Sequence, residues 1–216
     1  GFFDLQVNGW KGVDYSGPEL TPEGVTAVVR ALATAGTTRH LATLITSTQE
    51  QMCTNLELIT QAREHSPLIR AALPGFHLEG PGVSPQEGTR GVHDPAFIRA
   101  PSLSEYREWQ NAAKGLIKII TVAPEQKDAL PFIEKLCEDG VTAAVGHTAA
   151  EPETIRKAVQ AGAKLSTHLG NGSAAMLPRL DNFLWEQLAC DEMWASIISD
   201  GFHLPNSVLK VFHKAK

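Results

Sequence analysis

The chain has 216 residues, of which 43% are hydrophobic, so it can bury a core and fits one domain or a large part of a bigger one. Its 19 basic and 24 acidic residues give a formal charge of −5 without a basic stripe, which argues against nucleic acid as a partner. No apolar run approaches the roughly 18 residues of a membrane span. The cysteines, Cys53, Cys137 and Cys190, are odd in number and far apart, as expected for reduced thiols in a cytoplasmic protein.

Apolar runs rich in β-branched residues alternate along the chain with amphipathic segments, which predicts alternating strands and helices. Thr21 and Pro22 mark a helix start, and Gly36 and Gly140 stand where helices should stop. The predicted strands cover residues 3–7, 40–46, 73–78, 116–122, 141–145, 164–167 and 195–199, and the helical stretches include 21–35, 104–113, 128–138, 152–161 and 205–216. This pattern gives about seven parallel strand–helix units.

Such an order predicts an α/β fold, and we expect an incomplete TIM-like (β/α) barrel that forms a single domain over residues 1–216. A closed barrel needs eight strands and typically about 250 residues. We therefore expect the eighth unit and a flanking small β domain to be absent from this chain. An open doubly wound sheet would require a glycine-rich phosphate-binding turn after the first strand, and residues 7–12, Val-Asn-Gly-Trp-Lys-Gly, do not provide one.

Three residues of the kinds that bind metals each follow an apolar, strand-like run. They are Glu79 in His-Leu-Glu-Gly-Pro, His147 in Val-Gly-His-Thr and His168 in Ser-Thr-His-Leu. A single histidine at a strand end is more often structural or merely exposed than a ligand. One carboxylate and two imidazoles in three separate turns at the same rim of a barrel are harder to dismiss, because together they suit a divalent cation.

Six short motifs follow one another between residue 1 and about residue 205. They are Asp-Leu-Gln-Val-Asn-Gly at 4–9, His-Leu-Glu-Gly-Pro at 77–81, Gly-Val-His-Asp-Pro at 91–95, Gly-His-Thr at 146–148, Thr-His-Leu-Gly-Asn at 167–171 and Asp-Gly-Phe-His at 200–203. In this order they resemble the motifs of N-acetylglucosamine-6-phosphate deacetylases, of the amidohydrolase superfamily. The resemblance implies a TIM-like barrel and metal-dependent hydrolysis of the acetamide of N-acetylglucosamine 6-phosphate, giving glucosamine 6-phosphate and acetate.

The resemblance also implies which residues form the metal site. Glu79, His147 and His168 would hold one divalent ion, either Zn²⁺ or a neighbour such as Fe²⁺, Co²⁺ or Mn²⁺. Superfamily members with two metals carry His-x-His on the first strand, where this chain has Gln6 and Asn8 near the metal. We therefore expect a single metal ion.

Further residues take roles in substrate binding by the same resemblance. His93 lies in a segment, residues 80–101, that is too long for an idle connection, and it would polarise the acetyl carbonyl. Without the resemblance, the residues alone predict that His93 is an exposed loop histidine. The residues implied in binding the sugar phosphate are Asn171, Gly172, Arg179 and His203. The loop after His168, Leu-Gly-Asn-Gly-Ser-Ala-Ala-Met, departs from the family, which has an aromatic residue and an Ala-Met pair there.

The family's general base is an Asp at the end of the eighth strand, and we expect no counterpart in this chain. Asp200 belongs to a different motif, so little turnover is expected from these residues alone. Two other functions stay open: another amidohydrolase acting on a different linear or cyclic amide, or a barrel-derived binding module without catalysis. The expected partner is a small amino sugar phosphate rather than nucleic acid or a membrane. Trp185 and Trp194 suggest a homodimer but suit barrel packing equally well.

Overall fold

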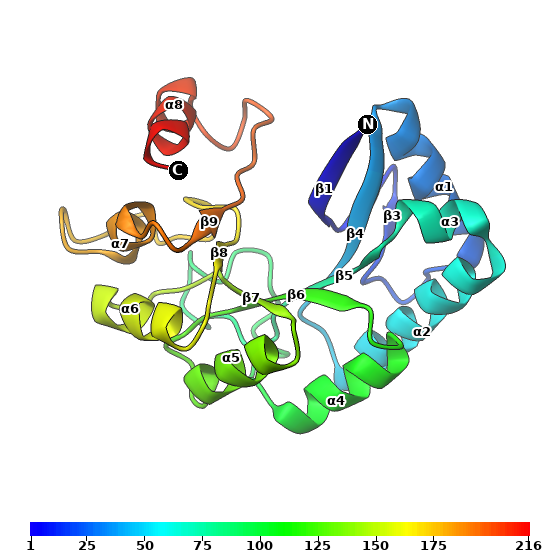
Figure 1. Cartoon of the computed structure of the whole chain (residues 1–216), viewed down its shortest axis with the longest axis horizontal. Helices are drawn as coiled ribbons and strands as arrows, with labels where there is room; N and C mark the ends of the chain where they lie inside the picture. Colours follow the sequence, from blue (N-terminus) through cyan, green and yellow to red (C-terminus); the bar gives the residue numbers. More distant parts are fainter. The chain divides into compact units, whose positions relative to one another are not determined.

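The computed structural model describes all 216 residues, and its helices and strands are labelled in Figure 1. Seven strands follow one another through one sheet in sequence order: β1 (Phe2–Val7), β4 (Thr37–Ile45), β5 (Gly75–Glu79), β6 (Ile117–Val122), β7 (Thr142–Val145), β8 (Leu165–Ser166) and β9 (Trp194–Ala195). The pairs β1–β4, β4–β5, β7–β8 and β8–β9 are parallel. Parallel strands in sequence order, joined by helices, are the arrangement of a TIM-like barrel, as the sequence predicts.

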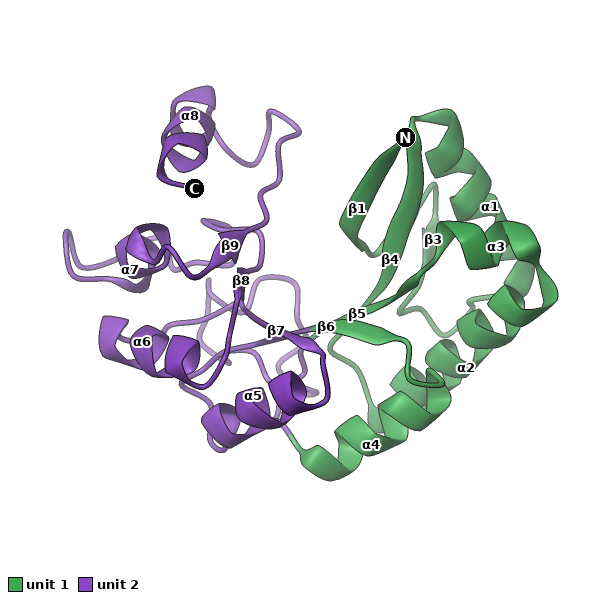
Figure 2. Cartoon of the chain, viewed as in Figure 1, with its two compact units in different colours: residues 1–79, 102–119 green, residues 80–101, 120–216 purple.

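The chain divides into two compact units, and the division runs through β6 (Figure 2). Unit 1 comprises residues 1–79 and 102–119, and unit 2 comprises residues 80–101 and 120–216. In unit 1 four helices lie to one side of β1, β4 and β5 (Figure 1): α1 (Pro22–Thr34), α2 (Gln49–His65), α3 (Pro67–Ala72) and α4 (Leu103–Ala112). As expected, Thr21 caps α1, since its side chain accepts a hydrogen bond from Gly24 N at 3.1 Å.

Two details of unit 1 differ from the sequence-based expectation. Residues 9–14 form a small antiparallel pair, β2 (Gly9–Trp10) with β3 (Val13–Asp14), although every strand was expected to be parallel. The turn that joins them places Lys11 and Gly12 at φ 51° and 86°, and this left-handed pair closes a tight hairpin. The strand predicted at 73–78 begins only at Gly75, because Leu73 caps α3.

Unit 2 contains β7, β8 and β9 together with α5 (Ala129–Glu138), α6 (Pro152–Gln160), α7 (Phe183–Ala189) and α8 (Asn206–Ala215). Residues on α7, on α8 and in the loops before them form one buried cluster, made of Leu169, Leu188, Leu204 and Phe212. The strand expected at 195–199 is shorter, because β9 pairs with β8 over Trp194 and Ala195 only. No helix combines the length and the apolar character that a membrane crossing requires. Cys53, Cys137 and Cys190 are free thiols and are half-buried.

A buried polar pair lies in the core of unit 1. Tyr15 and His40 are both almost fully buried, their rings stack with centroids 5.9 Å apart, and Tyr15 Oη lies 2.9 Å from His40 Nε2. Burial raises the pKa of Tyr15 and lowers the pKa of His40 to about 4, because each group loses hydration of its charged form. We therefore expect His40 to stay neutral in the folded protein at neutral pH.

This burial predicts a loss of stability in mild acid. Between pH 6.5 and about 4 the unfolded chain protonates His40 and the folded chain does not, so the free energy of unfolding falls as the pH falls through this range. The loss should reach about 3 kcal/mol from this one group. Urea unfolding from pH 7 to pH 4 measures it. In His40→Gln, which cannot titrate, the fall should be smaller by that amount, and equal slopes for the two proteins would contradict the assignment.

Candidate metal centre

The three candidate ligands stand where strands end. Glu79 is the last residue of β5, and His147 and His168 each follow their strands, β7 and β8, by two residues. The glycine before His147 is required by packing, because a Cβ at Gly146 would lie 2.8 Å from the side chains of Thr121 and Thr167. The hydroxyls of these two threonines lie 2.7 Å apart and form a hydrogen bond that joins β6 to the residue after β8.

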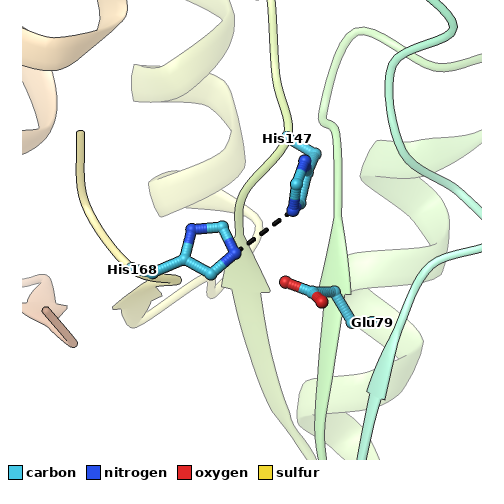
Figure 3. A group of neighbouring side chains, drawn as sticks. All are labelled: Glu79, His147 and His168. Carbon is cyan, nitrogen blue, oxygen red and sulfur yellow. Dashed lines mark hydrogen bonds between the residues drawn. The ribbon is translucent and has the colours of Figure 1, made fainter. Parts of the chain in front are cut away.

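The side chains of Glu79, His147 and His168 are brought together in a buried group, as Figure 3 shows. Each offers one ligand atom, and these atoms all lie within 4.8 Å of one another. The two imidazoles meet at their Nε2 atoms, 3.1 Å apart, with ring planes at 88°. A carboxylate oxygen and two imidazole nitrogens form a donor set that fits Zn²⁺ or a similar divalent cation.

The peptide bond that follows Glu79 is held by a backbone hydrogen bond. The next residue, Gly80, belongs to unit 2, and its N–H donates to Thr121 O at 3.1 Å. This hydrogen bond fixes the peptide plane that joins Glu79 to Gly80.

The second ring nitrogen of His147 decides which of its atoms can bind a metal. His147 Nδ1 lies 2.9 Å from the carbonyl oxygen of Thr89. A carbonyl oxygen can only accept, so Nδ1 carries the proton and Nε2 keeps its lone pair. The Nε2 atom is the one that faces His168. An imidazole held in this way by a carbonyl is the usual arrangement of a histidine that ligates a metal.

Two glycines make close contact with the His147 ring. A Cβ at Gly172 would lie 2.6 Å from His147 Nδ1, and a Cβ at Gly91 would lie 3.0 Å from His147 Cε1. Both glycines have left-handed backbones, with φ of 62° and 57°. Gly172, which the family resemblance assigns to the substrate, therefore also forms one wall of the cradle around His147.

Both histidines have unusual backbone conformations. The φ values are 47° at His147 and 31° at His168, in the left-handed region that residues other than glycine seldom adopt. Strain of this kind persists only where the surroundings impose it, and it is concentrated at functional sites. Hydrogen bonds impose it at His168, whose N–H donates to Ser196 Oγ at 2.8 Å and whose carbonyl accepts from Asn171 N at 2.8 Å.

His93 is not the exposed loop histidine that the residues alone indicate. It is 0% exposed, and its ring packs edge-on against His147 with centroids 4.4 Å apart. The turn that holds it is closed by a hydrogen bond from His93 N to Arg90 O. In this structure His93 belongs to the packing around His147, and its contact with an acetyl carbonyl stays a prediction.

The remaining predicted residues are less closely tied to this group. Asn171, Arg179 and His203 are exposed on loops of unit 2, and only Asn171 bonds to one of the three ligands. His203 Nδ1 lies 2.8 Å from Asp200 Oδ2, and hydrogen bonds from the backbone N–H groups of His203 and Phe202 lower the pKa of Asp200 to about 2. Gln6 is half-buried on β1 and Asn8 is exposed just after it, both in unit 1. Their placement near a metal stays a prediction.

Thr89 and Glu125 also shape the environment of His147, although no motif in the sequence points to either residue. Thr89 acts through its backbone carbonyl, for which the identity of the side chain is no signal. Glu125 lies in the loop after β6, and its carboxylate binds the turn after His147. Pairing Glu125 with that turn depends on the conformations of the loops after β6 and β7, which residue types do not specify.

Comparison with known proteins finds curated relatives along the whole chain, although no family model matches it. An N-acetylglucosamine-6-phosphate deacetylase of Bacillus subtilis is 33% identical over 220 residues, covering 100% of this chain and 54% of the relative. The Bos taurus protein of the same name is 34% identical over 226 residues, again covering 100% and 54%. An N-acetylgalactosamine-6-phosphate deacetylase of Shewanella is 33% identical over 207 residues, covering 94% and 50%. The chain spans about half the length of the curated relatives it matches.

Solved structures give the same result. The N-acetyl-D-glucosamine-6-phosphate deacetylase of Mycobacterium smegmatis, a mutant solved in complex with N-acetyl-D-glucosamine-6-phosphate, aligns over 100% of this chain and 54% of its own, with a TM-score of 0.90 and 28% identity. The enzyme from Thermotoga maritima aligns over 100% and 56%, with a TM-score of 0.86 and 28% identity. These matches support the incomplete TIM-like barrel inferred from the strand order.

Proposed function

Because the whole chain is homologous to about half the length of N-acetylglucosamine-6-phosphate deacetylases, we propose that the protein removes the acetyl group from an N-acetylated hexosamine phosphate. The products would be the amino sugar phosphate and acetate. The observation that carries this proposal is the group of Glu79, His147 and His168 at the ends of three strands, with ligand atoms within 4.8 Å of one another.

Glu79, His147 and His168 would hold one divalent ion, for which Zn²⁺ is the first choice by donor type. When bound, such an ion polarises an amide carbonyl and makes water more acidic, which are the two changes that amide hydrolysis needs. The chain's own residues prepare this chemistry. The Thr89 carbonyl orients His147, and burial of all three ligands keeps bulk water from competing for the ion.

Substrate recognition is proposed to involve residues of unit 2. Asn171, the Gly172 backbone, Arg179 and His203 are proposed to bind the sugar phosphate, and His93 to contact the acetyl carbonyl. Curated relatives of similar identity are named for glucosamine and for galactosamine phosphates, so either epimer is consistent with the comparison. Homodimer formation likewise stays a prediction, supported by the exposure of Trp185 and Trp194.

Acetate release by the full-length protein tests the function. The substrates are N-acetylglucosamine 6-phosphate, its galactosamine epimer and both unphosphorylated sugars, each with zinc supplied and after chelation. We expect release from a phosphorylated sugar that stops on chelation and returns with the metal. Turnover that survives removal of all metal, or turnover of a cyclic amide with none of the sugars, would reject the proposal in favour of a different activity.

The phosphate assignment predicts a selective effect of Arg179→Ala. A charge-assisted hydrogen bond to a phosphate is worth about 1.5 to 3 kcal/mol, so kcat/KM for the phosphorylated sugar should fall by roughly 10- to 100-fold. The unphosphorylated sugar offers this side chain no charge to bind and should be little affected. Arg30→Ala, an exposed arginine on α1, serves as the control. Equal losses on both sugars would show that Arg179 is structural.

A further inference from the structure

A carboxylate outside the proposed ligand set binds the turn that carries His147. Glu125 lies between β6 and α5, and its two oxygens accept hydrogen bonds from Thr148 Oγ1 at 2.6 Å and from Ala149 N at 2.7 Å. Thr148 Oγ1 in turn accepts from Ala150 N at 3.0 Å. We propose that Glu125 is a positioning residue that fixes the His147 imidazole for metal binding, an inference that rests on the proposed function.

His147 needs this support because of its backbone. A left-handed conformation at a residue with a side chain costs about 1 to 2 kcal/mol, so the turn would relax if its neighbours allowed it. The His147 carbonyl is already held by Ser84 N at 2.9 Å. The three residues that follow, Thr148, Ala149 and Ala150, are held directly or indirectly by the Glu125 carboxylate.

Glu125 is itself placed on a firm support. Pro124 precedes it, and backbone hydrogen bonds join Gln126 N to Ala123 O and Ala123 N to Gly82 O. The Gln126 side chain donates to Val83 O, which fastens the same turn to the segment after β5. The Glu125 carboxylate therefore links the loop after β6, which these hydrogen bonds hold in place, to the turn after β7.

The geometry also indicates how a displacement would reach the metal site. The Nδ1 atom of the His147 ring donates a hydrogen bond to Thr89 O, and Gly172 packs against that same nitrogen. If the turn after His147 relaxes toward an ordinary backbone, the ring must leave this narrow cradle. Nε2 then loses its alignment with His168, although neither of the other ligands is altered.

Four variants of the full chain test the proposal. Glu125→Ala removes both acceptors, and Thr148→Val removes the hydroxyl while keeping the shape of the side chain. Thr148→Ser keeps the hydroxyl and is the conservative rescue. Glu151→Ala is the matched control for charge, because this carboxylate stands at the start of α6, four residues after His147, and makes no side-chain capping hydrogen bond.

Two readouts separate positioning from simple stabilisation. The first is cobalt affinity of the folded protein, followed by visible absorbance. Glu125→Ala and Thr148→Val should weaken it by about 10- to 100-fold, while Thr148→Ser and Glu151→Ala stay close to the parent chain. The second is the nitrogen-15 spectrum of the imidazoles without metal, in which the protected Nδ1–H of His147, identified by its absence in His147→Gln, should be lost in the first two variants.

The two readouts together test the positioning role of Glu125 and the proposed metal function. Unchanged cobalt affinity in Glu125→Ala and Thr148→Val would overturn the positioning role, even if both variants melt earlier, and would leave the proposed function intact. A parent chain that binds no cobalt, but whose His147 signal is lost in both variants, would reject the metal function and support the positioning role. No cobalt binding together with an unchanged His147 signal would reject both.

Discussion

His147→Ala should weaken the binding of one equivalent of zinc by about 100- to 1000-fold. Zinc bound by four protein ligands contributes about 10 to 16 kcal/mol, or roughly 2.5 to 4 kcal/mol for each ligand, and each ligand removed costs a corresponding share of affinity. His168→Ala should have a similar effect because the two Nε2 atoms face the same point, 3.1 Å apart. Competition with a chromophoric chelator measures both constants.

His213→Ala is the matched control for this experiment, because His213 is exposed on α8 and lies outside the ligand group. It removes the same side chain from the same unit and should leave zinc affinity unchanged. If His213→Ala weakened binding as much as His147→Ala, the measured zinc would be held elsewhere on the protein. The assignment of the metal centre would then be wrong.

Gly172→Ala should lower zinc affinity by about 100-fold, although it touches none of the proposed ligand atoms of the metal. The added Cβ would lie 2.6 Å from His147 Nδ1 and 2.8 Å from Cε1, so the ring must move out of its cradle. The hydrogen bond to Thr89 O would be lost with it. Disturbing the contacts that orient a metal ligand lowers metal affinity by up to about 100-fold. We expect a loss near that limit because the position and the tautomer of the His147 ring change together.

Gly140→Ala supplies the control for backbone strain. Gly140 has φ 74°, close to the 62° of Gly172, and a Cβ there would meet no atom within 4 Å. Both variants should lose about 1 to 2 kcal/mol of stability from the left-handed backbone. Only Gly172→Ala should lose metal affinity, and equal zinc binding by the two variants would contradict the close approach seen at His147.

Much of the fold could be predicted from local patterns in the sequence. The elements that the prediction missed were missed for physical reasons. Helix α1 shows a capping Thr21, a Pro in its first turn and an apolar face, so its bounds were predicted within a residue. Helix α2 is missing from the predicted elements, because the buried polar residues Asn55 and Thr60 on its inner face interrupt the apolar stripe. Asn55 is buried because its amide donates to the carbonyls of Tyr15 and Gly17, a long-range contact with no sequence signature.

The candidate site likewise contains residues that could be predicted from the sequence and residues that could not. Glu79, His147 and His168 could be predicted because each is a ligand-type residue at the end of a buried strand or two residues beyond it. Burial of His93 could not, because it depends on how the segment after Gly80 folds back onto His147. The contribution of Thr89 depends on a backbone carbonyl and that of Glu125 on the conformations of two loops, and neither is visible in residue types.

Anomalous diffraction at the zinc edge, from crystals of the protein grown with zinc, tests the metal centre most directly. The account predicts one strong peak per chain, about 2.0 to 2.2 Å from a Glu79 carboxylate oxygen and from the Nε2 atoms of His147 and His168. The Nδ1 atom of His147 should remain on the Thr89 carbonyl. A peak bound to other residues, or no peak between these three side chains at saturating zinc, would contradict the account.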